Sequence, residues 1–501
     1  MPNLFETLSE HFPADRARPF AWLETGALMT YGDMIAGSAR YANALAALGV
    51  APGDRVMVQT PKSIEMLMLY LGSLRAGAVF VPLNTAYTAG ELAYFIEDAQ
   101  PALFVSDPAR REAVAGLAAD LKVETLGTAG EGTLAALAAR MPEGWTTVPR
   151  ADDDLAAILY TSGTTGRSKG AMLSHANLAS NALVLKDHWR FTGADVLLHA
   201  LPIFHTHGLF VATNVTLAAG AAMIFQEKFE ARAVMAALPR ASVMMGVPTF
   251  YIRLLGEPDF DRALTGHMRL FISGSAPLSA EIHREFAART GHAILERYGM
   301  TETSMNTSNP YEGDRIAGTV GLPLPGVDIR IADPETGAPL PRGEVGVIEI
   351  AGPNVFKGYW RKPEKTAEEF RDGHFISGDL GFIDERGYVS IVGRAKDLII
   401  AGGYNIYPAE VEAALDELPQ VHESAVVGVP HPDLGEGVVA AVVPREPGFA
   451  DEAALHAALS DRLARFKQPR RIMFMAELPK NTMGKVQKAV LREMFGKSFS
   501  F

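Results

Sequence analysis

Hydroxyl, glycine and basic residues are concentrated in one dense run near residue 165. The run covers residues 160–170 and reads Tyr-Thr-Ser-Gly-Thr-Thr-Gly-Arg-Ser-Lys-Gly. Short apolar segments of strand length, 155–160 and 171–175, lie on either side of it. Hydroxyls, glycine N–H groups that a ligand can approach closely, and two cations together suit phosphate oxygens. We therefore expect a loop between two strands that binds the polyphosphate of ATP.

Two other interpretations of this run fit less well. A Ser- and Gly-rich surface turn is common, but it does not require so ordered a series. A kinase-type loop, G-x-x-x-x-G-K-[ST], places its lysine directly after the last glycine, whereas Lys169 follows Gly166 by three residues and precedes Gly170. The spacing therefore disfavours a kinase-type loop.

Composition narrows the classes of function. The 501 residues, 48% of them hydrophobic, predict two or more globular domains. The net charge of −12, from 58 acidic and 46 basic residues without a basic stripe, argues against a nucleic-acid partner. The absence of cysteine excludes disulfides, thiolate metal ligands and a cysteine nucleophile. Any thiol chemistry must therefore come from a bound partner.

No segment has the pattern of a targeting peptide or a membrane span. Residues 1–10 contain acidic residues and predict a short amphipathic helix, unlike a signal peptide. Residues 196–226 contain no Asp, Glu, Lys or Arg, but Pro202, Gly208 and Asn214 interrupt them, which favours core strands and helices. We expect a cytoplasmic enzyme without a membrane span.

The elements that must hold the phosphate loop alternate between strands and helices. Apolar runs at 55–59 and 78–82 flank a helical pattern at 63–76, and the alternation resumes after residue 176. This pattern predicts an α/β fold with parallel sheets covered on both faces. Residues 125–153 show no clear strand. Two later strands, within 270–277 and 294–302, end in small polar turns, where ligands of open α/β sheets usually bind.

The sequence pattern changes in the last third of the chain, where Pro and Gly become frequent between short apolar segments. Residues 318–358 form short segments punctuated by Pro and Gly, which predicts a small antiparallel sheet or barrel. We expect a large N-terminal domain at 1–394, a hinge at 395–397, and a small, mobile α+β domain at 398–501. That last domain ends in a lysine-containing loop at 478–488.

Six short motifs, spread over essentially the whole chain, resemble those of the adenylate-forming superfamily and occur in the same order. Within it, residues 199–208, 295–302, 305–311 and 481–488 are most similar to malonyl-CoA synthetases. The motifs are 161–170, 298–302 (Tyr-Gly-Met-Thr-Glu), 377–379 (Ser-Gly-Asp), 393–397 (Gly-Arg-Ala-Lys-Asp), 402–406 (Gly-Gly-Tyr-Asn-Ile) and 479–485. The resemblance implies that a carboxylate attacks the α-phosphorus of MgATP, and that the thiol of coenzyme A then displaces AMP.

The resemblance also implies the residues that bind ATP and Mg²⁺. Tyr298 is expected to stack on adenine, and Glu302 with Thr301 is expected to hold Mg²⁺, to which Thr161 also contributes. For Tyr298 a plain core aromatic is the alternative. The phosphate loop contributes Thr161, Ser162, Gly163, Thr164, Thr165, Gly166 and Lys169, and the turns beside adenine contribute Ser275, Ala276, Pro277, Gly299 and Met300.

The resemblance also implies functional roles for residues in the C-terminal part of the chain. Asp379 is expected to accept both ribose hydroxyls with help from Arg394, because an ionised Asp offers two acceptor oxygens. Lys396 occupies the hinge position of the family, and Lys485, after Gly484, occupies the position of the adenylating lysine. Gly402 and Gly403 are expected to let the pantetheine of coenzyme A pass close to the backbone.

The choice of carboxylate is inferred from cations near the adenine tyrosine. Arg297 is the expected partner of a second carboxylate, because guanidinium suits bidentate recognition. His205, His207, Ser275 and Arg253 complete the expected pocket, although Arg253 fits a helix surface equally well. We expect malonate, with methylmalonate tolerated.

The alternatives are another short-chain or aryl acid, a luciferase-like oxidase, or a non-catalytic nucleotide-binding module. We further expect a monomer or a weak homodimer.

Overall fold

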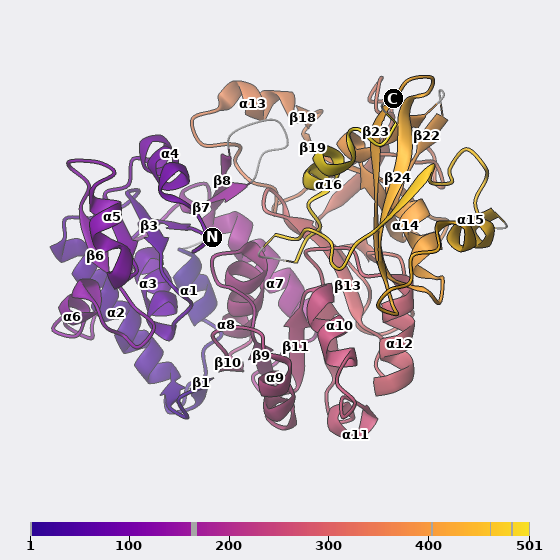
Figure 1. Cartoon of the computed structure of the whole chain (residues 1–501). Helices are drawn as coiled ribbons and strands as arrows, with labels where there is room; N and C mark the ends of the chain where they lie inside the picture. Colours follow the sequence, from indigo (N-terminus) through magenta and orange to yellow (C-terminus); the bar gives the residue numbers. More distant parts are fainter. Residues whose placement is uncertain (1–2, 162–167, 402–403, 461, 482–483, 500–501) are drawn as a thin grey trace.

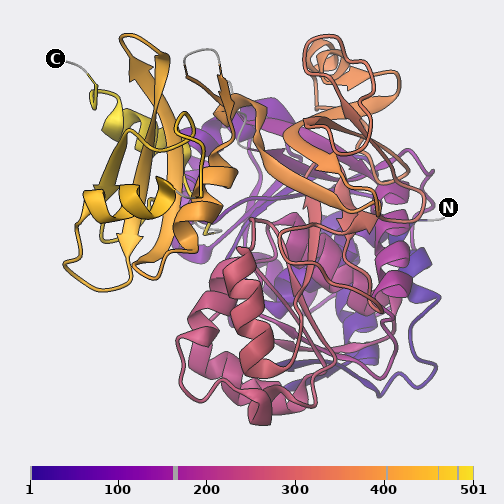
Figure 2. The ribbon, with the colours of Figure 1, turned by 90° about the vertical axis from the view of Figure 1, so that its right-hand side faces the viewer.

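The computed structural model describes residues 3–161, 168–401, 404–460, 462–481 and 484–499. The fold has a large N-terminal part built on three sheets and a smaller C-terminal part with a sheet of its own. Figures 1 and 2 show the C-terminal part, in yellow, as a separate lobe beside the large one. The predicted α/β fold with a large and a small domain is confirmed.

The first sheet has six strands in the order β6-β5-β3-β4-β7-β8, parallel except for the β7–β8 hairpin. Its strands are β3 (Arg55–Gln59), β4 (Val79–Pro82), β5 (Leu103–Ser106), β6 (Val123–Thr125), β7 (Leu155–Thr161) and β8 (Lys169–Ser174). Its helices are α2 (Tyr31–Ala47), α3 (Ile64–Arg75), α4 (Ala89–Ala99), α5 (Arg111–Ala115) and α6 (Thr133–Ala138). Helices α2 and α4 each begin with a capping box, Thr30 with Asp33 and Thr88 with Glu91.

The second sheet has nine strands in the order β15-β14-β13-β12-β11-β9-β10-β1-β2. Strands β13, β12, β11, β9, β10 and β1 run parallel, which places their carboxyl ends on one edge. The strands are β1 (Pro19–Leu23), β2 (Leu28–Thr30), β9 (Val196–His199), β10 (Ala222–Phe225), β11 (Val243–Gly246), β12 (Leu270–Ser273), β13 (Leu295–Met300), β14 (Ser304–Ser308) and β15 (Leu322–Pro323).

Helices pack against this second sheet and join it to the first. The amphipathic helix predicted at the N-terminus is α1 (Leu4–Ser9), whose Leu4 and Leu8 are fully buried. The others are α7 (His175–His188), α8 (Asn214–Ala218), α9 (Ala231–Ala237), α10 (Pro248–Leu255), α11 (Arg262–Thr265) and α12 (Ala280–Thr290). No helix within the described ranges is long and apolar enough to cross a membrane.

The predicted small antiparallel sheet is present. It contains β16 (Asp328–Ala332), β17 (Gly346–Ala351), β18 (Phe370–Arg371), β19 (His374–Ile383) and β20 (Val389–Arg394), and it is accompanied by α13 (Pro363–Glu368). The C-terminal sheet contains β21 (Ile399–Ala401), β22 (Tyr404–Ile406), β23 (Val421–His431), β24 (Gly435–Pro444) and β25 (Arg471–Phe474), with α14 (Pro408–Asp416), α15 (Glu452–Ser460) and α16 (Lys488–Phe495).

The structure defines two segments that the sequence described only in outline. Within the uncharged segment 196–226, residues His207–Thr213 form a π-helix, which α8 continues. The segment 125–153, which showed no clear strand, contains helix α6, which contacts α2 and β6. Its short Ala-rich sequence has a weak pattern, so tertiary packing decides its structure.

The two lobes touch through a few side chains and one loop. Arg445 Nη2 lies 3.1 Å from Glu281 Oε1, and Arg284 Nη2 lies 3.6 Å from Glu417 Oε1. Gly484 packs against Thr249 at the start of α10, since a Cβ at Gly484 would lie 3.0 Å from the Thr249 side chain. The loop after Leu478 therefore reaches the large lobe.

Candidate active site

The hairpin β7–β8 flanks the loop that the sequence predicts to bind phosphate, so the expected position of that loop between two strands is confirmed. Thr161 pairs with Lys169 at its open end, while Ser162, Gly163, Thr164, Thr165 and Gly166 lie outside the described residues. Helix α4 holds both ends of the loop: the Tyr94 hydroxyl donates to the Ser168 carbonyl at 2.7 Å, and the Tyr160 hydroxyl donates to Asp98 Oδ2 at 2.6 Å. The base of the loop is therefore fixed by neighbouring structure.

Lys169 and Glu302 are linked through two residues that the sequence did not single out. Lys169 Nζ lies 2.6 Å from Glu369 Oε1 and 4.0 Å from the centre of the Tyr359 ring. The Tyr359 hydroxyl lies 2.6 Å from Glu369 Oε2 and 3.1 Å from Glu302 Oε1. Glu302 is 7% exposed, and burial raises the pKa of its carboxyl. A cation beside Glu302 would relieve this cost.

The residues around Glu302 fit a hard cation. The described residues contain no group of three or more His, Cys, Asp or Glu side chains arranged to hold a metal. Magnesium typically takes one or two carboxylates, with substrate phosphates and water completing its shell. Glu302 offers such a carboxylate. The Thr161 hydroxyl lies at the end of strand β7, where it contacts the Lys169 carbonyl of β8. Thr301, next to Glu302, is half-buried.

Tyr298, Asp379 and Arg394 form one cluster between β13 and the small sheet. The Tyr298 hydroxyl donates to Asp379 Oδ2 at 2.6 Å, and Arg394 Nε lies 2.6 Å from Asp379 Oδ1. Asp379 is opposite Arg394 in the β19–β20 ladder, which explains their contact. Burial, with the Asp379 charge beside it, raises the pKa of Tyr298 well above its usual value, so the phenol stays a donor.

Arg297 is buried beside the turn that follows β12. It is 3% exposed, and within the described residues neither its Nε nor its Nη2 has a hydrogen-bond partner. The guanidinium lies against the backbone of Gly274, where an added Cβ would be 2.4 Å from Arg297 Cζ. Burial lowers the pKa of Arg297 to about 9, which still leaves it cationic at neutral pH. Such a cation calls for an anionic ligand.

Two neutral histidines and a serine lie beside Arg297. His207 Nδ1 is 3.2 Å from Ser275 Oγ, while His207 Nε2 and His205 Nδ1 are buried and unpaired within the described ranges. Burial, and next the Arg297 charge, lower the pKa of His205 to about 4 and that of His207 well below its usual value. Both rings are therefore neutral at pH 7, so they add polar atoms without adding charge.

The neighbouring turn residues surround the same space. Ser275 has a left-handed φ of 72°, which turns the chain away from β12. Ser275, Ala276, Gly299 and Met300 are half-buried, while Pro277 is exposed. Arg253, by contrast, is exposed on α10, which agrees with a helix-surface position and leaves it apart from the buried Arg297 cluster.

Lys485 comes from the small lobe and faces this site. Its loop packs on Thr249 through Gly484, whose φ of 74° suits glycine. Desolvation, and next the Arg394 charge, lower the pKa of Lys485, and the Lys485 charge in turn lowers the pKa of His205. The ammonium therefore stands near both Arg394 and His205, although its side chain remains accessible to solvent. The loop that carries Lys485 thus reaches the large lobe at the start of α10.

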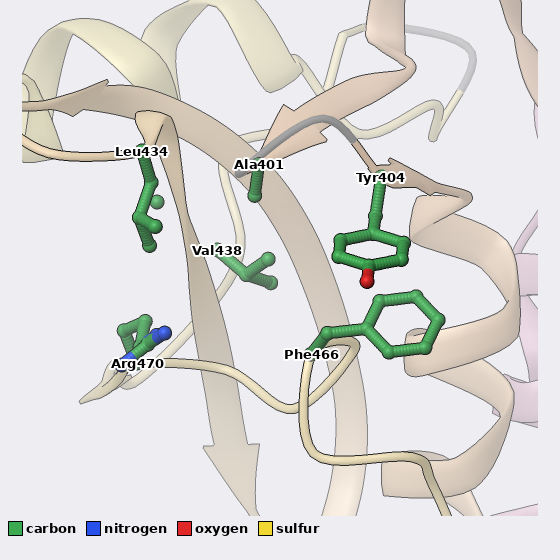
Figure 3. A pocket seen from close by; sticks show the side chains of 7 residues that line it. Ala401, Tyr404, Leu434, Val438, Phe466 and Arg470 are labelled. Atoms are coloured by element: carbon green, nitrogen blue, oxygen red, sulfur yellow. The ribbon is translucent and has the colours of Figure 1, made fainter.

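The residues expected to form the hinge and to let the pantetheine pass lie within 395–403 of the sequence. Lys396 is exposed on a short turn, Ala395–Asp397, where Asp397 pairs with Arg492 of α16. Gly402 and Gly403 lie outside the described residues. A cavity of about 180 Å³ lies in the small lobe (Figure 3) and is lined by Ala401, Tyr404, Leu434, Gly437, Val438, Phe466 and Arg470. The Tyr404 and Phe466 rings stack there with centroids 4.6 Å apart.

Comparisons with known proteins agree with this geometry. Residues 5–360 match the family model described as AMP-binding enzyme, and residues 410–485 match that of the AMP-binding enzyme C-terminal domain. The ATP-bound crystal structure of MatB from Rhodopseudomonas palustris is 58% identical, covers 99% of both chains and has a TM-score of 0.97. The apo structure of the same protein, with the same identity and coverage, has a TM-score of 0.87.

Curated relatives include ligases for different acids. A feruloyl-CoA synthase from Amycolatopsis sp is 39% identical over 476 residues, which span 94% of this chain and 95% of that protein. A malonate–CoA ligase from Arabidopsis thaliana is 34% identical over 481 residues, which span 89% of this chain and 78% of that protein. The class of reaction is therefore shared among relatives while the acid differs.

Proposed function

The chain belongs to the AMP-binding enzyme family of adenylate-forming acyl-CoA ligases, and we propose that its acid is malonate. The products are then malonyl-CoA, AMP and pyrophosphate. The observation that carries the choice of malonate is the buried Arg297 guanidinium, with two unpaired nitrogens and neutral histidines beside it. The similarity to MatB and to a malonate–CoA ligase supports the same choice.

The reaction needs no nucleophile from the protein. In the first step one carboxylate oxygen of malonate bonds to the α-phosphorus of ATP, and pyrophosphate leaves. In the second step the sulfur of coenzyme A attacks the acyl carbon, its proton is lost, and AMP leaves. The protein's part is to position the reactants and to neutralise developing charge, which agrees with a sequence without cysteine.

Each group of site residues has a place in the first step. Lys169 and the phosphate loop hold the β- and γ-phosphates, and Glu302 holds magnesium, which neutralises phosphate charge when bound. Asp379, already oriented by Arg394 and Tyr298, accepts the ribose hydroxyls. Lys485 places its ammonium between the substrate carboxylate and the α-phosphate. In binding malonate, Arg297 takes the carboxylate that does not react.

The cavity of Figure 3 suits the nucleotide end of coenzyme A. Its stacked Tyr404 and Phe466 offer a ring surface for adenine, and Arg470 offers a cation for phosphate. In the sequence, the lining residues Ala401 and Tyr404 flank the two glycines, Gly402 and Gly403, that are expected to let the pantetheine pass. We propose that the hinge at 395–397 swings this side of the small lobe toward the adenylate for the second step.

An aryl acid or a fatty acid is the principal alternative, since a feruloyl-CoA synthase is among the relatives. Such an acid would leave the Arg297 charge buried without an anion, which costs several kcal/mol. A luciferase-like oxidase would share the first step but would consume oxygen. Methylmalonate fits the proposal, because one methyl group changes pocket binding by only about 1–3 kcal/mol.

The test is coenzyme A-dependent AMP formation with acetate, malonate, methylmalonate, succinate, ferulate and octanoate. We expect the highest kcat/KM for malonate, activity with methylmalonate, and no oxygen uptake. A higher kcat/KM for ferulate or octanoate would contradict the proposal, and oxygen uptake linked to AMP formation would favour the oxidase.

A further inference from the structure

Lys62 makes unusual contacts close to the acyl pocket. It lies between β3 and α3, and its Nζ is 2.9 Å from the His199 carbonyl oxygen and 3.2 Å from His199 Nδ1. The same ammonium lies 4.3 Å from the centre of the Phe225 ring. His199 is fully buried at the end of β9, and Phe225 ends the neighbouring β10. Lys62 thus holds the ends of two strands whose carboxyl edge faces the site.

These contacts fix the tautomer of His199. Its Nε2 is 2.9 Å from the Gly208 carbonyl oxygen, which can only accept a hydrogen bond. Nε2 therefore carries the proton, and in a neutral imidazole Nδ1 must then accept. Lys62 supplies the donor that Nδ1 needs. Burial, and next the Lys62 charge, lower the pKa of His199 well below its usual value, in agreement with a neutral ring.

His199 in turn holds the segment that carries His207. The Gly208 carbonyl accepts from both His199 Nε2 and the Thr213 hydroxyl, at 2.9 and 3.0 Å. Gly208 also packs on the Pro202 carbonyl so closely that an added Cβ would lie 2.0 Å from that oxygen. The peptide after His207 is thereby clamped, and His207 meets Ser275 in the pocket.

We propose that Lys62 is a positioning residue which, through His199, holds His207 in the geometry that binds the free carboxylate of the substrate. This inference rests on the proposed function, since it assumes that the pocket beside Arg297 takes an anionic acyl group. Lys62 itself does not touch the reacting atoms; it acts through the His199 ring and the Gly208 carbonyl.

The kinetic test uses Lys62→Met, which keeps an unbranched stem over Phe225 but removes the donor. We expect KM for malonate to rise at least about tenfold and KM for ATP to stay within about twofold. Lys122→Met is the matched control, since Lys122 Nζ also donates to a backbone carbonyl, that of Leu48, away from the site; its KM for malonate should not change. An unchanged KM for malonate in Lys62→Met, or equal rises for both substrates, overturns the proposal.

Two substitutions at His199, by glutamine and by leucine, distinguish a role of its hydrogen bonds from a role of its packing. Glutamine can accept from Lys62 and donate to Gly208 as the Nε2–H tautomer does, so His199→Gln should keep KM for malonate within about threefold of wild type. Leucine fills the space without hydrogen bonds, so His199→Leu should match Lys62→Met. Equal kinetics for the glutamine and leucine variants would contradict a role for these hydrogen bonds.

A spectroscopic readout needs no substrate. In ¹⁵N-histidine-labelled protein, with His199→Gln identifying the signal, wild-type His199 should show a protonated Nε2 and a bare Nδ1. In Lys62→Met, Nε2 should stay protonated on the Gly208 carbonyl, while the Nδ1 shift should change because Nδ1 loses its donor, and an unchanged Nδ1 shift overturns the proposal. If wild type fails to use malonate, the proposed function fails, while this readout still decides whether Lys62 fixes His199.

Discussion

Arg297 carries its charge inside the protein, and the groups around it leave that charge available. Gly274 gives it space, the flanking histidines are neutral, and two guanidinium nitrogens are unpaired among the described residues. A buried guanidinium has lost its contact with water, so it favours a substrate that brings a second carboxylate. A substrate with an uncharged group at that position leaves the cation buried and unpaired. Under the proposed function, Arg297 would make the main contribution to selectivity for a dicarboxylate.

Arg297→Ala should lower kcat/KM for malonate by more than about a hundredfold, from about 3 kcal/mol of lost transition-state binding. Steady-state AMP formation measures this. Arg253→Ala is the matched control, since Arg253 is exposed on α10, and its kcat/KM should stay near that of wild type. Malonate kinetics unchanged in Arg297→Ala would remove Arg297 from the pocket.

Lys485→Ala should abolish adenylate formation and spare thioester formation from supplied malonyl-AMP, because the ammonium acts on charge that develops only in the first step. Pyrophosphate exchange measures adenylate formation, and the yield of thioester from supplied malonyl-AMP measures the second half-reaction. Lys480→Ala serves as control, since Lys480 is paired with Glu423 at 2.6 Å. Survival of both half-reactions in Lys485→Ala would show the assignment to be wrong.

The turns and strand ends position these residues. The turn after β12 supplies both the space for Arg297 and the Ser275 hydroxyl that meets His207, while the β7–β8 hairpin presents Lys169 to Glu369. Parallel order in the nine-stranded sheet brings the ends of β9, β12 and β13 to one edge. The site is therefore assembled from turns whose backbones leave little room for extra atoms.

Gly274→Ala should test the turn directly. The new Cβ would meet Arg297 Cζ at 2.4 Å, so the guanidinium must move, and KM for malonate should rise at least about tenfold. Gly90→Ala on α4, where an added Cβ meets nothing within 4 Å, provides the control. If Gly274→Ala retained wild-type KM for malonate, the close contact at Gly274 would have no bearing on substrate binding.

Helix α14 offers a prediction on stability and pH. Burial raises the pKa of Asp416 to about 7, above its unfolded value near 4, so the folded state binds the extra proton between these pH values. The stability of the protein should therefore fall as pH rises from about 4 to 7 through this group. Asp416→Asn, which can still accept from the Ser424 hydroxyl, should raise Tm by a few degrees at pH 8 and by less at pH 5. A gain in Tm that did not grow with pH would contradict the shift.

At the scale of the whole molecule, the two lobes are joined by exposed ion pairs and one loop contact. Exposed pairs such as Arg445–Glu281 stabilise by at most about 1 kcal/mol each. The arrangement is nearer to ATP-bound MatB than to the apo form, with TM-scores of 0.97 and 0.87. Weak contacts of this kind are compatible with the proposed swing of the small lobe.

Local patterns in the sequence were enough to predict much of this molecule. The strands that flank the 160–170 loop and the small antiparallel sheet follow from short windows of residues. Tyr359, Glu369 and the contact between Lys62 and His199 escaped notice, because their importance comes from contacts between distant parts of the chain; Lys169 and Glu369, for example, are 200 residues apart. Single residues of this kind have no periodic pattern by which to recognise them.

The most direct test of recognition of a second carboxylate compares malonate with its monomethyl ester, which has nearly the same shape but only one charge. The measurement is kcat/KM for coenzyme A-dependent AMP formation by the wild-type protein and by Arg297→Ala. We predict that wild type prefers malonate by at least about a hundredfold and that this preference largely disappears in the variant. Equal kcat/KM for the two acids in the wild-type protein would contradict recognition of a second carboxylate.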